Sequence, residues 1–149
     1  MLIGDNVRIY HRAWLVTLKK DDDSPSLIIE DNTVIGHYAV IAAKKNVRIG
    51  KKVLIADKVY ISDNLHGYED IATPIMDQPV IYKGKVYIGD NSWIGQNVSI
   101  IGASIGKHCV VGANSVVVKD LPDYCVAAGA PATVIKKYNF ETNEWQRVD

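Results

Sequence analysis

An aliphatic residue recurs at every sixth position over most of this 149-residue chain. Such a period does not fit an amphipathic helix, whose apolar residues return every three to four positions. A small or aliphatic residue also stands four places after the recurring residue in thirteen of the fifteen units. The units form five groups of three and start at Ile3, Ile9, Leu15, Ile29, Ile35, Ile41, Ile49, Ile55, Ile61, Ile88, Ile94, Ile100, Ile105, Val111 and Val117.

The period of six suits short strands joined by tight turns, with glycine relieving the turn geometry. Three units would close one triangular turn, and stacked turns would bury a continuous aliphatic column, as in a repeat protein. We therefore predict an all-β fold, a parallel β-helix. An antiparallel sandwich with accidental spacing is the alternative, and fifteen units in phase argue against it. The glycines that directly follow a unit start are Gly4, Gly36, Gly50, Gly89, Gly95, Gly106 and Gly112.

The breaks in the repeat predict where the chain leaves the scaffold. Residues 19–26 are polar and rich in turn formers, which indicates a solvated loop. Two extra residues around 44–46 predict a small bulge. The longest break, an excursion loop near 67–85, carries two prolines and follows His66 directly. A loop of that length within a compact array is usually functional or disordered.

Composition excludes several classes of protein. Lys and Arg together number 17, as do Asp and Glu, so the chain lacks the positive excess of a nucleic-acid-binding protein. It shows neither a signal-peptide pattern nor about 20 consecutive apolar residues. We therefore expect a cytoplasmic protein without membrane insertion. Cys109 and Cys125 make no zinc or disulfide framework, and we expect reduced thiols.

Three segments in the C-terminal half carry a resemblance to a known family. They are Ile88-Gly-Asp-Asn-Ser-Trp-Ile-Gly95, Val111-Gly-Ala-Asn-Ser-Val-Val-Val-Lys-Asp-Leu-Pro122 and Gly129-Ala-Pro-Ala-Thr-Val-Ile-Lys-Lys137. The chain resembles the hexapeptide-repeat acyltransferases, and most closely the maltose and galactoside O-acetyltransferases and relatives that acetylate capsule or lipopolysaccharide sugars. The resemblance implies a left-handed parallel β-helix over residues 1–137, with a C-terminal tail, 138–149, packed on the last coil.

His66 is the predicted catalytic residue. It ends the segment Asp63-Asn-Leu-His66, which is similar to the segment that holds the family's catalytic histidine. Histidine suits a general base at neutral pH because its reference pKa is about 6.5. On position alone, a histidine that only packs or caps the loop is an equal alternative. His11, His37 and His108 are weaker candidates.

The resemblance also implies acetyl-CoA as co-substrate. Trp93 lies at an outward repeat position and corresponds to the tryptophan that lines the coenzyme arm, although a tryptophan buried between subunits would look the same. Lysines are expected at the coenzyme phosphates, although each could be an ordinary surface group. The remaining predicted coenzyme-binding residues are Gly95, Gln96, Gly112, Ala113, Lys119, Lys136 and Lys137.

The predicted acceptor is a sugar or sugar nucleotide, bound near the excursion loop. Asp63 could orient His66, bind the acceptor or cap a turn, and these alternatives stay open. Asn64, Tyr68 and Tyr82 are further candidates by location. The chain lacks the helical segment with which related sugar acetyltransferases often begin. The resemblance implies a homotrimer with active sites between subunits.

Three other functions are compatible with parts of this sequence. N-acetylation of an amino-sugar nucleotide uses the same chemistry and cannot be separated from O-acetylation by sequence. A non-catalytic β-helix scaffold would not need His66, the long loop and Trp93 together. The γ-class carbonic anhydrases share the scaffold but need three histidines around one zinc ion, two of them close in sequence. Histidines 11, 37, 66 and 108 contain no such pair, so no metal site is predicted.

Overall fold

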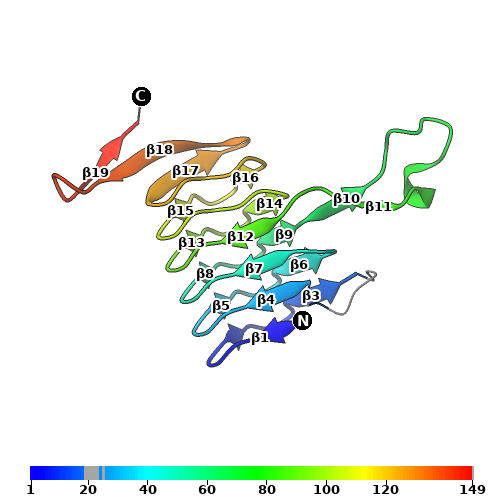
Figure 1. Cartoon of the computed structure of the whole chain (residues 1–149), viewed down its shortest axis with the longest axis horizontal. Coiled ribbons are helices and arrows are strands. Elements are labelled where there is room, and N and C mark those ends of the chain that lie inside the picture. Colours follow the sequence, from blue (N-terminus) through cyan, green and yellow to red (C-terminus); the bar gives the residue numbers. More distant parts are fainter. Residues whose placement is uncertain (19–23, 25, 149) are drawn as a thin grey trace.

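The chain folds into a three-sided prism of short parallel strands, a left-handed β-helix (Figure 1). The computed structural model describes residues 1–18, 24 and 26–148. Strands in successive coils pair in parallel register, as in Leu54↔Trp93 and Trp93↔Val110. The predicted all-β fold and the stacking of triangular coils are confirmed.

Each side of the prism is one sheet, which we number in chain order. Face 1 contains β1 (Leu2–Ile3), β4 (Leu27–Ile29), β7 (Val47–Ile49) and β12 (Val86–Ile88). Face 2 contains β2 (Arg8–Ile9), β5 (Val34–Ile35), β8 (Leu54–Ile55), β13 (Trp93–Ile94), β15 (Val110–Val111), β17 (Cys125–Gly129), β18 (Ala132–Asn139) and β19 (Glu144–Arg147). Face 3 contains β3 (Trp14–Thr17), β6 (Val40–Ala43), β9 (Tyr60–Ser62), β14 (Ser99–Ile101) and β16 (Val116–Val117).

The aliphatic unit starts form the core. From Ile29 to Val117, every predicted start is at most 1% exposed. The first coil differs, because Ile3 and Ile9 are 47% and 41% exposed. No coil lies beneath them within the described residues, so the N-terminal end of the aliphatic column is open.

Glycine plays a different part from the one expected. Gly36 does not have a positive φ, and a Cβ there would lie 2.5 Å from the carbonyl carbon of Ala56 in the next coil. The left-handed turn conformation falls instead two residues later, as at Tyr38 with φ 58° and Asn32 with φ 61°. Glycine is therefore needed for the close approach of coils, and asparagine and other residues carry the turn.

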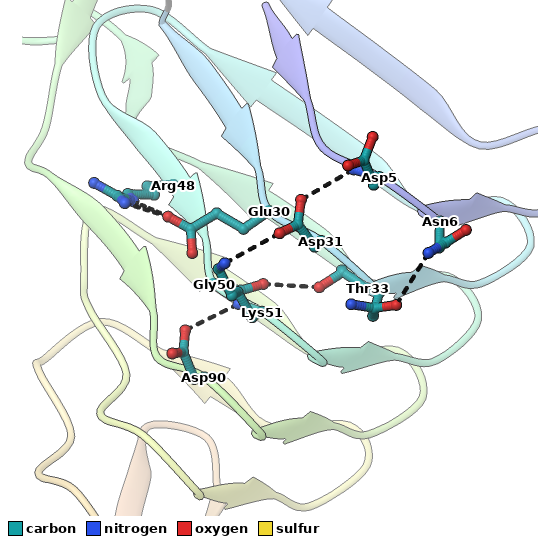
Figure 2. Close-up of polar contacts among 10 residues, drawn as sticks. Asp5, Asn6, Glu30, Asp31, Thr33, Arg48, Gly50, Lys51 and Asp90 are labelled. Atoms are coloured by element: carbon teal, nitrogen blue, oxygen red, sulfur yellow. Dashed lines mark hydrogen bonds and ion pairs between the residues drawn. The ribbon is translucent and has the colours of Figure 1, made fainter.

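Carboxylates connect the coils at the corners (Figure 2). Asp31 accepts the backbone N–H of Asp5 at 3.0 Å, and Asp90 accepts that of Lys51 at 2.9 Å. Each acid stands two places after a unit start, and the N–H that it accepts belongs to the preceding coil. These bonds satisfy turn N–H groups that the strand ladders leave free.

The C-terminal end of the prism is covered by an antiparallel extension of face 2. Strand β18 pairs with β17, and Ala132 and Val134 pack against the core. Strand β19 then pairs with β18. Because β18 runs through residue 137, the chain has no break at the predicted boundary, and the division into 1–137 and 138–149 stays a prediction.

The two cysteines lie in the last coils. Both are buried and free, with the Sγ atoms 3.6 Å apart. The predicted loop at 19–26 falls mostly outside the described residues. No helix within the described residues is long and apolar enough to span a membrane.

Candidate functional site

A β-hairpin carries His66 away from the prism (Figure 1). Strand β10 (Asn64–His66) pairs antiparallel with β11 (Val80–Tyr82), with His66 opposite Val80. A short 3₁₀ turn, η1 (Ile75–Asp77), lies between them. The excursion therefore begins at residue 64, earlier than the predicted 67, because β10 already pairs outside the three faces.

His66 is exposed, and its ring is oriented by no hydrogen bond within the described residues. Side chains alternate between the two faces of a hairpin, so His66 shares a face with Asn64. Tyr82 is paired with Asn64 and lies diagonally across from His66, at roughly 7–8 Å between Cα atoms. An aromatic ring of this size can reach that distance, so Tyr82 can border whatever approaches His66.

Asp63 anchors the base of the hairpin. Its side chain is fully buried and accepts the backbone N–H groups of Lys44, Lys45 and Asn46, each at 2.7 Å. Asn64 adds a side-chain N–H at 2.8 Å. These bonds occupy the carboxylate and close the predicted bulge at 44–46. The structure thus favours the turn-holding alternative for Asp63 over contact with an acceptor.

The other acceptor candidates differ in exposure. Asn64 is 8% exposed, and its amide nitrogen donates to the carbonyl oxygen of Ala42 at 3.0 Å, which ties it to the prism. Tyr82 is 37% exposed, with Lys45 Nζ 5.4 Å from its ring centroid. Burial, followed by the Asp63 charge, raises the pKa of Tyr82. Tyr68 is 61% exposed beyond the end of β10.

A shallow groove lies at the corner between faces 2 and 3, which we call corner 2–3. Its volume is about 330 Å³, and Lys58, Gln96, Asn97, Ala113 and Asn114 line it. Two of these residues, Gln96 and Ala113, were predicted to bind the coenzyme. Lys58 was missed, although it holds the same position in the repeat as the two asparagines. This shared position in the repeat was the sequence signal that could have identified Lys58.

The two predicted glycines lie behind this groove. A Cβ at Gly95 would be 2.8 Å from the backbone nitrogen of Ala113, so Gly95 is in contact with the next coil. A Cβ at Gly112 would meet first the Cβ of Ala128, at 3.2 Å. Gly95 therefore has a packing role in this structure, whichever ligand occupies the groove.

Trp93 and Lys136 share the outward side of face 2. Trp93 is 50% exposed, between Leu54 and Val110 in the ladder. The same row continues through Val126 to Lys136 on β18. Lys137, the next residue, faces the other side of β18, opposite Cys125.

Lys119 lies apart from the other two predicted lysines. It follows β16 on face 3, at the corner between faces 3 and 1, which we call corner 3–1. Lys136 and Lys137 are on β18 of face 2. One chain therefore does not assemble all three lysines into a single phosphate clamp.

The predicted base and the predicted donor groove lie at opposite edges of face 3. Gly102 touches the hairpin base, because its N–H donates to Ser62, whereas Asn97 lines the groove. Asn97 and Gly102 are five positions apart along nearly extended chain, which spans roughly 16 Å. Figure 1 likewise shows the hairpin leaving the side opposite β8, β13 and β15. A single chain does not bring His66 to its own groove.

Metal ligation has no structural support within the described residues. They contain no group of three His, Cys, Asp or Glu side chains placed to hold an ion. His37 and His11 lie at corner 2–3, His66 lies on the hairpin, and His108 lies at the corner between faces 1 and 2.

Comparison with known proteins identifies close relatives. A family model described as "Hexapeptide repeat of succinyl-transferase" matches residues 26–62 and 85–119. A putative lipopolysaccharide biosynthesis O-acetyl transferase from Escherichia coli K12 is 40% identical over 128 residues, covering 81% of this chain and 65% of the relative. The chain spans 42% and 58% of two further curated acetyltransferases, so it matches less than two thirds of these relatives' length.

Two solved structures share the fold over most of the chain. A galactoside acetyltransferase in complex with coenzyme A has a TM-score of 0.79 and 30% identity, covering 99% of this chain and 70% of that one. A hexapeptide-repeat acetyltransferase from Vibrio cholerae, complexed with acetyl coenzyme A, has a TM-score of 0.78 and 27% identity. It is matched over 71% of its length and 93% of this chain.

Proposed function

The chain belongs to the hexapeptide-repeat acetyltransferases, and we propose that it transfers an acetyl group from acetyl-CoA to a sugar hydroxyl. The observation that carries the proposal is the exposed His66 on a hairpin anchored by the buried Asp63. The β10–β11 hairpin holds the His66 imidazole in solvent and away from the prism, as suits a general base whose substrate binds outside its own prism. Coenzyme complexes of two relatives support the choice of donor.

The reaction is direct attack on the thioester. His66 takes the proton from the acceptor hydroxyl while the hydroxyl oxygen bonds to the acetyl carbonyl carbon. The tetrahedral intermediate then collapses, the carbon–sulfur bond breaks, and the leaving CoA thiolate takes the proton back from the His66 imidazolium, which restores the base. No acyl-enzyme is formed, because the acceptor itself is the nucleophile. The products are the acetyl ester and free CoA.

The donor is proposed to lie along corner 2–3 and the neighbouring edge of face 2. The groove formed by Gln96 and Ala113 would hold the thin pantetheine arm, with Trp93 packing on its apolar part. Gly95 and Gly112 keep the backbone close and flat there. Lys136 is proposed to meet a coenzyme phosphate, which its place in the same outward row as Trp93 supports. Lys119 and Lys137 are further proposed phosphate contacts.

The active site is proposed to be shared between copies in a homotrimer. Within one chain, His66 and the groove lie at opposite edges of face 3, so each hairpin would serve the groove of a neighbour. Half-exposed apolar side chains on face 2, Trp93 and Leu54, suit burial against another copy. Tyr68 and Tyr82, on the hairpin, would then face the acceptor, with Asp63 and Asn64 supporting the hairpin from below.

The proposed setting is the biosynthesis of a surface polysaccharide in the cytoplasm. A relative at 40% identity is named for lipopolysaccharide biosynthesis, which supports a sugar acceptor. The acceptor is either a free or polymeric sugar or a sugar nucleotide. N-acetylation of an amino-sugar nucleotide is the alternative that sequence left open.

The test is CoA release from acetyl-CoA in the presence of neutral sugars, amino sugars and sugar nucleotides. The parent protein is compared with His66→Ala and with His108→Ala, a matched change at another exposed histidine. We expect His66→Ala to lower kcat by about 10²- to 10⁴-fold and His108→Ala to leave it unchanged. Equal turnover in the parent and His66→Ala would contradict the assignment of the base.

The same experiment separates the alternatives. Turnover with amino-sugar nucleotides alone would replace O-acetylation by N-acetylation. Absence of turnover, together with no thermal shift by CoA, would favour the non-catalytic scaffold.

A further inference from the structure

Corner 2–3 continues beyond the groove toward the N-terminus and carries a histidine–carboxylate pair there. Asp57 Oδ1 accepts the backbone N–H of His37 at 2.8 Å and lies 3.0 Å from His37 Nδ1. The backbone N–H of His37, and then its ring, hold the pKa of Asp57 below its ordinary value. An ionised carboxylate accepts from Nδ1–H, so the Nε2 atom of neutral His37 is left as a hydrogen-bond acceptor.

Tyr10, from the preceding coil, stacks on this imidazole. The ring centroids are 5.0 Å apart, and the planes are inclined by 26°. Tyr10 is 45% exposed, and the side chains of His37 and Asp57 are 44% and 47% exposed. The pair therefore offers solvent an aromatic surface and, in the Nδ1–H tautomer that Asp57 favours, an acceptor nitrogen.

This arrangement differs from the two other histidine–tyrosine contacts among the described residues. His11 meets the ring of Tyr38 edge-on, with centroids 6.1 Å apart and planes inclined by 81°. His108 and Tyr124 lie 6.0 Å apart with planes inclined by 31°. There the nearby acid, Asp123, accepts from the backbone of Lys107 and pairs with its side chain. No carboxylate bonds the His108 ring within the described residues, so His108 lacks the contact that favours the Nδ1–H tautomer of His37.

The pair is contiguous with the proposed donor groove. Lys58, which lines the groove, directly follows Asp57 in sequence. Strands β5 and β8 are paired, so the coil that carries His37 lies about 4.8 Å from the coil that carries Asp57. A group at the end of the groove nearest Lys58 would be within one coil of His37 Nε2.

We propose that His37, Tyr10 and Asp57 form part of the acceptor-binding site. A hydroxyl of a saccharide would donate to His37 Nε2, and the apolar face of the sugar ring would pack on Tyr10. Asp57 is a positioning residue that keeps the nitrogen available. The inference rests on the proposed sugar acetyltransferase function and adds to it the chain's own contacts with the acceptor.

Kinetics with a saccharide that the parent acetylates test the inference. His37→Phe keeps the stack but removes the nitrogen, and we expect the acceptor KM to rise roughly five- to tenfold, the loss of one hydrogen bond. The KM for acetyl-CoA should not change. Tyr10→Leu should raise the acceptor KM, whereas Tyr10→Phe should restore it. His108→Phe is the matched control and should match the parent.

Nitrogen NMR of the four histidine rings gives a second readout that a purely structural role would not move. We expect His37 to be the Nδ1–H tautomer in the parent and a mixture in Asp57→Asn, which still accepts the backbone N–H. Adding the saccharide that the parent acetylates, without acetyl-CoA, should shift the Nε2 signal of His37. If the parent acetylates saccharides but His37→Phe keeps the parent KM and His37 does not shift, this inference is wrong. If the parent acetylates none, the proposed function fails first, and the inference fails with it.

Discussion

The carboxylate of Asp63 accepts the backbone N–H of Asn46 at 2.7 Å, from the coil before the one that carries the hairpin. Lys44 and Lys45 donate to the same group, and the side chain of Asp63 is fully buried. One acid thus closes the bulge of one coil and fixes the point where the next coil leaves the prism. The position of His66 depends on this contact.

Asp63→Ala should destabilise the fold by about 3–5 kcal/mol, because it leaves three partly buried N–H groups without their charged acceptor. Urea unfolding measures the change. Asp90→Ala, which removes a partly exposed acid with one N–H partner, should cost about 1 kcal/mol. Similar losses for the two variants would mean that Asp63 is no stronger an anchor than the other corner acids.

Gly36→Ala should cost at least about 1–3 kcal/mol, because the added Cβ would lie 2.5 Å from backbone carbon of Ala56. In Gly112→Ala the added Cβ would meet nothing closer than the Cβ of Ala128, at 3.2 Å, so this change should cost less. Neither glycine has a positive φ, so the comparison isolates coil contact from backbone conformation. Thermal unfolding of the two variants is the measurement, and equal losses would contradict the close-approach explanation.

Ile55→Ala should lower the free energy of unfolding by about 2–5 kcal/mol, since the side chain is fully buried in mid-column. Ile9→Ala is the matched change in the open first coil, where the side chain is 41% exposed, and it should cost less than about 1 kcal/mol. A large loss for Ile9→Ala would show that something covers the N-terminal end in solution.

Acid should weaken the hydrogen bonds that the corner carboxylates accept, whereas the aliphatic core contains no group that titrates with them. The backbone N–H of Asp5 and then Lys51 lower the pKa of Asp31, and His37 lowers that of Asp57. A lowered folded-state pKa means stability that is present above the unfolded value of about 3.9 and is lost as pH falls through the folded value. The melting temperature should therefore fall between about pH 5 and pH 2, and less steeply in Asp57→Asn. An equal slope in parent and variant would exclude a contribution from Asp57.

Trp93→Ala should raise the KM for acetyl-CoA by about tenfold, because the proposed coenzyme arm loses an aromatic surface worth about 1 kcal/mol or more. Trp14→Ala, which changes an exposed tryptophan on face 3, serves as control. Steady-state kinetics and size-exclusion chromatography should be run together. Loss of the trimer in Trp93→Ala would assign Trp93 to the subunit interface instead. An unchanged KM in a variant that keeps the trimer would contradict the coenzyme contact.

The sequence by itself determined the repeat and therefore the core. The step of six residues is a covalent spacing, so it specifies which side chains point inward, and Ile29 to Val117 are buried as predicted. It also located His66 at the start of an excursion. The first coil is the exception, because the burial of Ile3 and Ile9 depends on a neighbour that the pattern does not encode.

Only the tertiary structure decided which residues meet between coils. The insertions at 44–46 and after His66 differ in length, and they determine which residues of successive coils are stacked. Contacts between stacked coils join positions about twenty residues apart, such as Asp63 with Asn46 and Asp57 with His37. The same stacking put His66 and the groove of Gln96 at opposite edges of face 3. The six-residue period determines whether a side chain points inward or outward. Which residues it contacts in the neighbouring coils depends on the lengths of those coils.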